Sequence, residues 1–297
     1  MAKADTITVA LIQQSCGDDI ATNLDRCLQG IADAAANGAR LVLLQELHNS
    51  QYFCQTEDTR YFDLAEAIPG PSSERLGQAA RQFDVVIVCS LFEKRATGLY
   101  HNTAVVIDTD GQIAGLYRKM HIPDDPGYYE KFYFTPGDLG FKPVQTSIGR
   151  LGVLVCWDQW FPEAARLMRL AGADILLYPT AIGWDPADNN EEKNRQRDAW
   201  QIIQRSHAIS NNLPVLSCNR VGFETAIDNP ATGIEFWGSS FICGPQGEIL
   251  DEAPYNKECV LMADISLNRS HEISKIWPFL RDRRIDAYQD LLRRFID

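Results

Sequence analysis

The sequence predicts one domain of the α/β class, in which helices pack on sheets that contain both crossovers and hairpins. Short β-branched runs alternate with amphipathic stretches along the chain. Two turn signals, at 109–111 and 245–248, each join two predicted strands. No repeat, low-complexity tract or linker divides residues 1–297, so we expect the whole chain to form a single domain.

The first half of the chain predicts strands that alternate with two helices, followed by a hairpin. In the first helix, Leu24, Cys27, Leu28, Ile31 and Ala35 recur at intervals of three and four and give one apolar face. The run at 41–44 is wholly apolar, which is typical of a strand buried on both faces. The sequence Pro-Gly-Pro-Ser-Ser at 69–73 supplies a turn and a helix cap. The predicted elements are a strand at 7–12, a helix at about 23–36, a strand at 41–44, a helix ending at 83, a strand at 85–89 and hairpin strands at 101–108 and 112–119.

The second half continues the alternation after a long segment, 121–142, that is rich in proline and aromatic residues. The sequence Asn-Asn-Glu-Glu at 189–192 caps a long helix, because it offers side-chain acceptors and negative charge to the first turn. The predicted elements are a strand at 151–156, a helix at about 162–170, a strand at 175–178, a helix reaching about 211, strands near 215–219, 239–243 and 260–263, and a basic helix near 281–295.

The composition excludes several classes of partner. Lys and Arg total 28 and Asp and Glu total 40, which gives a formal net charge of −12. A nucleic-acid partner needs a basic face and is not expected. No apolar run approaches the ~18 residues of a membrane-spanning helix, so no membrane partner is expected either. The polar segment 1–6 leads directly into a strand, and we therefore expect no signal peptide and a cytoplasmic location.

The eight cysteines predict neither a disulfide framework nor a metal site. They are scattered along the chain without a Cys-x-x-Cys pair, whereas a disulfide scaffold or a zinc ribbon needs local clusters. The five histidines also lack the spacing of metal ligands. We expect no metal and no cofactor, and we expect most cysteines to be small core residues.

Three chemically reactive side chains stand at the ends of predicted buried strands, where ligands and catalytic groups gather in α/β folds. These are Glu46, Lys119 and Cys156. A carboxylate can take the proton of a thiol nucleophile, and an ammonium can stabilise the oxyanion that the attack creates. The backbone N–H of Trp157 is a candidate second oxyanion donor. Taken singly, each side chain is more often packed or ion-paired, so the spacing alone leaves a structural interpretation open.

The sequence around these three residues resembles the signature regions of the nitrilase, or carbon–nitrogen hydrolase, superfamily. The three regions are Gln45-Glu46-Leu47, Tyr117-Arg118-Lys119-Met120-His121 and Val155-Cys156-Trp157-Asp158-Gln159, and their order and separation match the family pattern. Further stretches, at 121–124, 130–134, 136–138, 157–164 and 178–183, extend the likeness from about residue 7 to about residue 284.

The resemblance implies a four-layer αββα sandwich and a catalytic triad of Glu46, Lys119 and Cys156. It also implies an auxiliary glutamate, Glu130, that orients Lys119 or the substrate. The activity that it implies is hydrolysis of a ureido C–N bond in a small molecule, with release of ammonia and carbon dioxide. Family members form homo-oligomers, and the C-terminal tail, about 265–297, is the candidate contact segment.

The residues around the nucleophile favour a cationic ureido substrate, such as a carbamoylated diamine. Relatives that act on N-carbamoyl amino acids place an arginine just after the nucleophile, whereas this chain has the uncharged Gln159 and Trp160 there. A buried carboxylate without a cationic partner would cost several kcal/mol. Asp125 is the preferred partner of a terminal ammonium, although an acidic turn exposed to solvent is an equally good interpretation. Tyr52, Trp160 and Trp184 are candidates for the lining of an aliphatic channel.

Other functions remain open from the sequence. The same triad serves amidases, nitrilases and other ureido hydrolases, so the substrate is the least constrained part of the prediction. A binding or scaffold protein on the same sandwich would be indicated by a missing triad residue, and all three are present. A zinc hydrolase would lose activity with a chelator, whereas we expect sensitivity to thiol alkylation instead.

Overall fold

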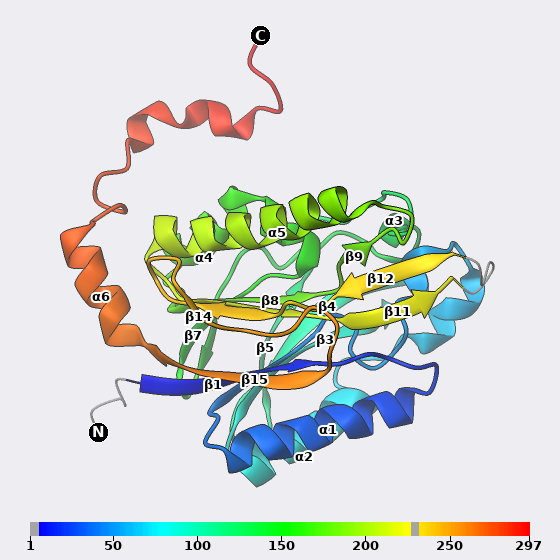
Figure 1. The fold of residues 1–297 in the computed structure, drawn as a ribbon. Coiled ribbons are helices and arrows are strands. Elements are labelled where there is room, and N and C mark those ends of the chain that lie inside the picture. The colour runs from blue at the N-terminus through cyan, green and yellow to red at the C-terminus, as the bar shows by residue number, and fades with distance from the viewer. Residues whose placement is uncertain (1–5, 227–231) are drawn as a thin grey trace.

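The protein is a four-layer αββα sandwich, in which two six-stranded sheets face each other and helices cover the outer face of each (Figure 1). This computed structural model describes residues 6–226 and 232–297. The layers confirm the predicted fold class. Residues 1–5, on which the expectation about a signal peptide depends, lie outside the described ranges.

The first sheet has the strand order β15-β1-β2-β3-β4-β5. The neighbours β1, β2 and β3 are parallel, and the remaining pairs are antiparallel. Its strands are β1 (Thr6–Gln13), β2 (Leu41–Leu44), β3 (Val86–Ala96), β4 (Leu99–Ile107), β5 (Ile113–Arg118) and β15 (Cys259–Ser266). The helices α1 (Ile20–Ala36) and α2 (Pro71–Phe83) cover this sheet in Figure 1.

The second sheet has the order β14-β13-β10-β8-β7-β6, with β7, β8 and β10 parallel. Its strands are β6 (Val144–Thr146), β7 (Gly149–Val153), β8 (Ile175–Thr180), β10 (Val215–Asn219), β13 (Phe241–Cys243) and β14 (Ile249–Glu252). The helices α4 (Pro162–Leu170) and α5 (Asn190–Asn211) lie on its outer face. A small third sheet joins β11 (Val221–Thr225), β12 (Gly233–Trp237) and β9 (Gly183–Trp184).

Apolar side chains fill the space between the layers. One cluster lies between the two sheets and continues beneath α4 and α5, and a second lies between the first sheet and α1 and α2. The predicted apolar strand Leu41–Leu44 is buried along its whole length, as expected for a strand with a layer on each side. A third, aromatic cluster includes Tyr52, Phe53 and Phe236. It packs beside the ends of the strands that carry the candidate catalytic residues.

Several predicted boundaries differ from the structure. The helix α1 begins three residues before the predicted start, because Asp19 caps it by accepting the N–H of Thr22 at 2.8 Å. The strand predicted at 151–156 ends at Val153, so Cys156 begins a 3₁₀ turn, Cys156–Trp160, instead of ending a strand. The strand predicted at 85–89 extends to Ala96 and pairs with β4 as a second hairpin.

The predicted basic helix near 281–295 is wrong. The last α-helix is α6 (Leu267–Ile276), and two short 3₁₀ turns, Ile285–Ala287 and Gln289–Leu292, follow it. Most helical stability comes from packing an apolar face, and this segment extends away from the layered body in Figure 1. Its apolar side chains are exposed, with Leu292 at 95%.

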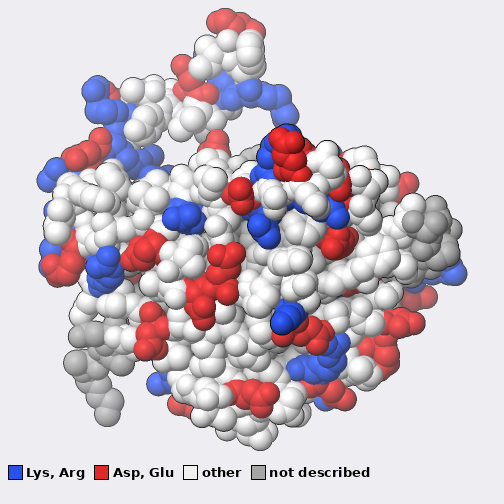
Figure 2. Space-filling model, viewed as in Figure 1, with Lys and Arg blue, Asp and Glu red and all other residues white. Residues whose placement is uncertain are grey.

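Two properties of the described residues bear on possible partners. Among the residues described, no helix is long and apolar enough to cross a bilayer. On the face drawn in Figure 2, acidic and basic side chains are interspersed. The negative net charge is therefore not gathered into one patch on that face.

Candidate active site

Glu46, Lys119 and Cys156 come together at the ends of strands from both sheets. Glu46 lies two residues after β2, Lys119 directly follows β5, and Cys156 lies three residues after β7. All three are buried. The N–H of Glu46 donates to the carbonyl of Thr180 at the end of β8 at 3.3 Å, which joins the two sheets at the site. The predicted grouping of these residues is thus present in the fold.

Lys119 bridges two buried carboxylates. Its Nζ donates to Glu46 Oε1 at 2.8 Å and to Glu130 Oε2 at 2.6 Å. Glu130 is the first residue of the short helix α3 (Glu130–Tyr133) and is fully buried. An ammonium has three donors, so one N–H of Lys119 remains for a further acceptor. That donor can bind an oxyanion, the role that the sequence predicts for Lys119.

Glu46 has one oxygen that is held and one that is free to take a proton. Its Oε1 accepts from Lys119 and also from Asn102 Nδ2 at 2.7 Å. Its Oε2 is buried without a hydrogen-bond partner among the described residues. A desolvated carboxylate oxygen that lacks a partner is costly unless a ligand or reacting group supplies one. This arrangement suits a general base.

Cys156 sits in a strained turn that presents its sulfur to the site. It adopts φ 43°, the left-handed region that a residue with a side chain rarely occupies. Its Sγ donates to the carbonyl of Ala181 at 3.8 Å. Burial raises the pKa of the Cys156 thiol well above its usual range, and the charges of Glu46 and Glu130 raise it further. The resting group is a thiol, so attack requires a base beside it.

Asp158 holds the turn that carries Cys156. Its carboxylate accepts from the N–H of Val155 at 2.9 Å, from Tyr117 Oη at 2.8 Å and from the ring of His121 at 2.7 Å. Sequence reasoning did not single out Asp158, although its position two residues after the nucleophile was a usable signal. A buried carboxylate with this many donors fixes the backbone around it.

Glu130 and Lys119 have ionisation behaviour set by their shared burial. Burial, together with the charge of Glu46, raises the pKa of Glu130 to about 7, although Lys119 opposes this. Burial alone would lower the pKa of Lys119, but the charges of Glu130 and Glu46 outweigh it and raise that pKa well above its usual value. Lys119 therefore stays charged, and Glu130 takes up a proton near neutral pH.

This proton uptake predicts an acid limb in the pH dependence of activity. Below pH about 7 Glu130 is protonated and Lys119 loses the charge of one of its two carboxylate partners, so kcat/KM should fall. The change Glu130→Gln removes one of the two carboxyls and should move this limb to lower pH while reducing the rate. Initial rates of the wild type and of Glu130→Gln between about pH 5 and about pH 9 measure the acid limb of each protein. A limb that stays at the same pH in the variant would contradict the assignment.

The residues predicted to bind substrate take different places. Trp157 is the second residue of the 3₁₀ turn. The first backbone N–H groups of a helical turn have no acceptor within the turn itself. Asp125 is half-buried, burial raises the pKa of its carboxyl, and it lies close enough to Lys119 to be influenced by that charge. Tyr52 is buried, and its hydroxyl donates to Glu130 Oε1 at 2.7 Å, so it orients Glu130. Tyr52 and Asp125 therefore lie beside the charged cluster, at Glu130 and near Lys119.

Gln159 and Trp160 lie less directly at the site. Gln159 is fully buried, and its Oε1 accepts from Trp200 Nε1 at 3.0 Å and from the Thr180 hydroxyl at 3.3 Å. The amide oxygen of Gln159 is therefore occupied by hydrogen bonds within the core under α5. Trp160 is half-buried, and its ring meets the ring of Trp157 edge to face at 6.5 Å. A contact of either residue with substrate stays a prediction.

An open cleft of about 810 Å³ lies beside Tyr128. Tyr128 belongs to both the cleft and the charged cluster, because it lines the cleft and its pKa is raised by burial and then by the neighbouring Cys156, Asp125 and Glu46. Glu57, Asp185 and aromatic side chains that include Trp184 also line it, and its described lining contains no lysine or arginine. The cleft next to the site is thus acidic and aromatic.

The donor sets do not form a metal centre. Within residues 6–226 and 232–297, no group of three or more His, Cys, Asp or Glu side chains is arranged to hold a metal ion. The predicted independence from metal and cofactor stays a prediction.

Comparisons with known proteins agree with this geometry. A family model described as carbon-nitrogen hydrolase matches residues 8–275. The chain is 44% identical to an N-carbamoylputrescine amidase of Arabidopsis thaliana, over 96% of this chain and 95% of that protein. It is 41% identical to a citrullinase of Francisella tularensis, over 97% of this chain and 99% of that protein. The crystal structure of a carbon-nitrogen hydrolase from Helicobacter pylori G27 matches with a TM-score of 0.95 and 52% identity, over 98% of this chain and all of that one.

Proposed function

The chain belongs to the carbon–nitrogen hydrolase family, and on this premise we propose that it hydrolyses N-carbamoylputrescine to putrescine, ammonia and carbon dioxide, a step of polyamine biosynthesis. The observation that carries the chemical part of the proposal is the buried cluster of Glu46, Lys119 and Glu130 around Cys156. The identity to named N-carbamoylputrescine amidases and the acidic cleft support the choice of substrate.

The first half of the reaction forms a covalent intermediate on Cys156. Glu46 Oε2 takes the thiol proton as the sulfur attacks the carbamoyl carbon, and the C=O electron pair moves onto oxygen. Lys119 and the backbone N–H of Trp157 donate to this oxyanion. When the oxyanion collapses, one C–N bond breaks and the departing nitrogen receives the proton from Glu46. An S-carbamoyl thioester and a free amine or ammonia result.

The second half releases the enzyme. Glu46 takes a proton from water, the resulting hydroxide attacks the thioester carbonyl, and the C–S bond breaks with return of the proton to sulfur. The carbamic acid that leaves decomposes to carbon dioxide and the remaining nitrogen compound. Lys119 acts in both halves because the same oxygen carries the negative charge in each tetrahedral state.

The distal end of the substrate carries an ammonium, which suits the acidic cleft. Asp125 lies within the influence of the Lys119 charge and directly precedes Pro126, which lines the cleft, and Glu57 and Asp185 line the cleft itself. An ammonium gains from these carboxylates and from the faces of Tyr128 and Trp184. A substrate with a distal carboxylate would meet like charge without a lining cation to pair with it.

Substrate selectivity tests this proposal. We expect kcat/KM for N-carbamoylputrescine to exceed that for L-citrulline and for N-carbamoyl-β-alanine by at least about a hundredfold, the effect of about 2.7 kcal/mol of discrimination. Ammonia release from the three compounds at equal concentration measures it. The change Asp125→Asn should raise KM for N-carbamoylputrescine. Preference for N-carbamoyl-β-alanine would contradict the acidic-cleft argument.

Citrulline hydrolysis is the second candidate, because a citrullinase is 41% identical over nearly the whole chain. Citrulline carries the same ureido group and a distal ammonium, but it adds a carboxylate at that end. The same ammonia assay separates the two functions. Faster turnover of L-citrulline would favour the citrullinase assignment and leave the cysteine chemistry unchanged.

We also propose that residues 1–297 act as one carbon–nitrogen hydrolase domain in a homo-oligomer that works in the cytoplasm. All eight cysteines are free thiols, a state that reducing compartments maintain. The last residue of α6 and the segment after it leave a row of apolar side chains exposed, which a second copy of the chain would cover. Its exposed members are Ile276, Trp277, Phe279, Leu280, Ile285, Tyr288, Leu291, Leu292, Phe295 and Ile296. The molar mass by light scattering tests the oligomer.

A further inference from the structure

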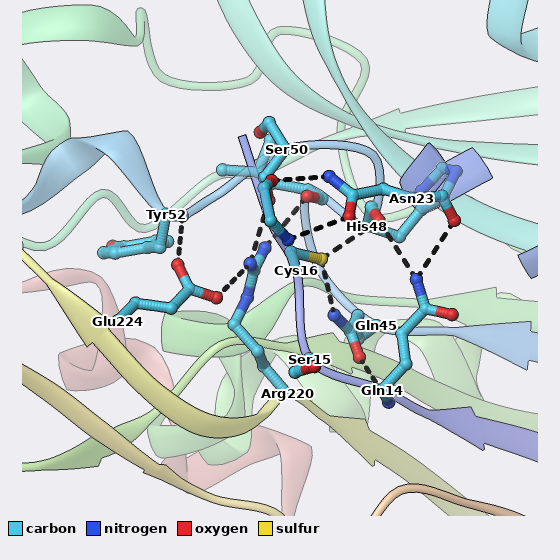
Figure 3. Close-up of polar contacts among 12 residues, drawn as sticks. Gln14, Ser15, Cys16, Asn23, Gln45, His48, Ser50, Tyr52, Arg220 and Glu224 are labelled. Atoms are coloured by element: carbon cyan, nitrogen blue, oxygen red, sulfur yellow. Dashed lines mark hydrogen bonds and ion pairs between the residues drawn. The ribbon is translucent and has the colours of Figure 1, made fainter. Parts of the chain in front are cut away.

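Arg220 is buried, and its guanidinium binds the backbone of the turn at residues 46–50; Figure 3 shows it with Ser50 and Glu224. Its Nη2 donates to the carbonyls of Glu46 at 3.0 Å and Leu47 at 2.9 Å. Its Nη1 donates to the carbonyl of Ser50 at 2.8 Å and to Glu224 Oε1 at 2.7 Å. All four terminal N–H donors are therefore used, three of them on the backbone between residues 46 and 50.

The turn needs this support because its backbone is strained. Leu47 adopts φ 47°, in the left-handed region that disfavours a leucine. The carbonyls of Glu46 and Leu47 both accept from the same nitrogen, so they point to one side and place like partial charges near each other. Both groups are buried, so the loss of their donor would leave them unsatisfied. The planar fork of an arginine can reach several acceptors at once, whereas a lysine presents a single nitrogen.

Glu224 links Arg220, through Tyr52, to Glu130, which is the second carboxylate of the site. It lies in β11 and is almost fully buried, and its Oε2 accepts the backbone N–H of Tyr52 at 2.6 Å. Tyr52 in turn donates its hydroxyl to Glu130 Oε1. Figure 3 shows Glu224 between Arg220 and Tyr52, with a contact to each. One ion pair thus holds the main chain at both Glu46 and Tyr52.

The neighbouring residue holds the other side of the site. Asn219, the last residue of β10, accepts the N–H of Ile182 and donates to its carbonyl, both at 3.0 Å. Ile182 follows Ala181, whose carbonyl accepts the thiol of Cys156. Asn219, at the end of β10, therefore fixes the segment beside Cys156, and the adjacent Arg220 fixes the turn that carries Glu46. Exact spacing of base and nucleophile governs the rate of a reaction between them.

We propose that Arg220 and Glu224 are positioning residues, which hold the turn of Glu46 and the backbone of Tyr52 in the geometry that activates Cys156. The inference deepens the proposed function and rests on it for the reaction, but not for the activation of the thiol. A buried ion pair is weak evidence for stability, since desolvation offsets its attraction. The four directed hydrogen bonds of the Arg220 guanidinium indicate instead that the pair fixes the positions of the groups it binds.

The test compares two variants with one control of stability. Arg220→Lys keeps the charge and loses the fork, and Glu224→Gln keeps the volume and loses the charge. Ile31→Ala removes buried volume under α1, away from the site, and is the control for a merely destabilised protein. Two rates are measured per folded molecule: hydrolysis of N-carbamoylputrescine, and alkylation of Cys156 by iodoacetamide, read by mass spectrometry of its peptide.

We expect Arg220→Lys to lower kcat at least about tenfold with KM changed less than about threefold, because the lost geometry belongs to the transition state. Alkylation of Cys156 should slow by a similar factor, and Glu224→Gln should show both effects in weaker form. Ile31→Ala should lower the melting temperature and leave both rates at the wild-type value.

The proposal is overturned if Arg220→Lys and Glu224→Gln melt earlier but hydrolyse and alkylate at the wild-type rates, as the control does. A wild-type protein that alkylates at Cys156 without hydrolysing N-carbamoylputrescine would refute the proposed substrate. In that case the alkylation rates still decide the role of Arg220 and Glu224, because they require no ureido substrate.

Discussion

Replacing Cys156 by alanine is expected to lower kcat at least about ten-thousandfold, because no other group at the site can form the covalent intermediate. The fold should persist. Cys156 is 3% exposed, and its side chain makes one weak hydrogen bond, to Ala181, so removal of the sulfur leaves only a small cavity. Ammonia release measures the activity, and circular dichroism with thermal melting measures the fold.

The control for this variant is Cys218→Ala. Cys218 is also fully buried and donates a weak hydrogen bond, to the carbonyl of Ile12, but it lies in the core of the second sheet. The Cys218→Ala variant should lose a similar amount of stability to Cys156→Ala and keep the wild-type activity. If Cys156→Ala retained more than about one per cent of the wild-type rate, the nucleophile would be another group.

Replacing Lys119 by methionine is expected to affect both stability and activity. The change leaves Glu46 and Glu130 buried without their shared cation, and breaking such a pair costs about 3–5 kcal/mol of unfolding free energy. The oxyanion also loses its charged donor, so kcat should fall at least about a hundredfold. Chemical denaturation at about pH 8, where unpaired carboxylates would be ionised, measures the stability.

The way in which the stability loss of Lys119→Met depends on pH distinguishes the loss of the shared cation from a packing defect. Without Lys119, the charge that lowers the pKa of Glu130 is lost, so this pKa rises further and the folded variant holds a proton that the unfolded state releases above pH about 4.3. The deficit relative to wild type should therefore shrink as the pH is lowered toward about 5. Lys275→Met, in an exposed pair with Glu272, should cost less than about 0.5 kcal/mol at either pH. A deficit for Lys119→Met that does not change with pH would contradict the account.

The layers of the fold could be predicted because their signals are local. The apolar run Leu41–Leu44, the Asn189 cap of α5 and the turn between β4 and β5 each report on neighbouring residues, and the structure confirms all three. The segment after residue 280 shows the limit of such signals. Its basic composition predicts a helix, but its apolar side chains stay exposed and only two short 3₁₀ turns form.

Glu46, Lys119 and Cys156 could be predicted because their surroundings resemble a known family, whereas their spacing alone left a structural interpretation open. The residues that hold them are not visible in the same way. Arg220 acts through the backbone of residues 170 or more positions away, and such a contact leaves no periodicity. A charged residue directly after the apolar strand Val215–Asn219 was the one available signal. Partners of this kind are found only when the fold brings distant segments together.

The nucleophile is tested most directly by mass spectrometry of the wild-type protein, acid-quenched during turnover of N-carbamoylputrescine. We expect an adduct on the Cys156 peptide of about 43 Da if putrescine leaves first, or of about 114 Da if ammonia leaves first. No adduct should form in Cys156→Ala. Rapid product formation with the adduct on another residue, or with unmodified Cys156 at every quench time, would contradict covalent catalysis by this thiol.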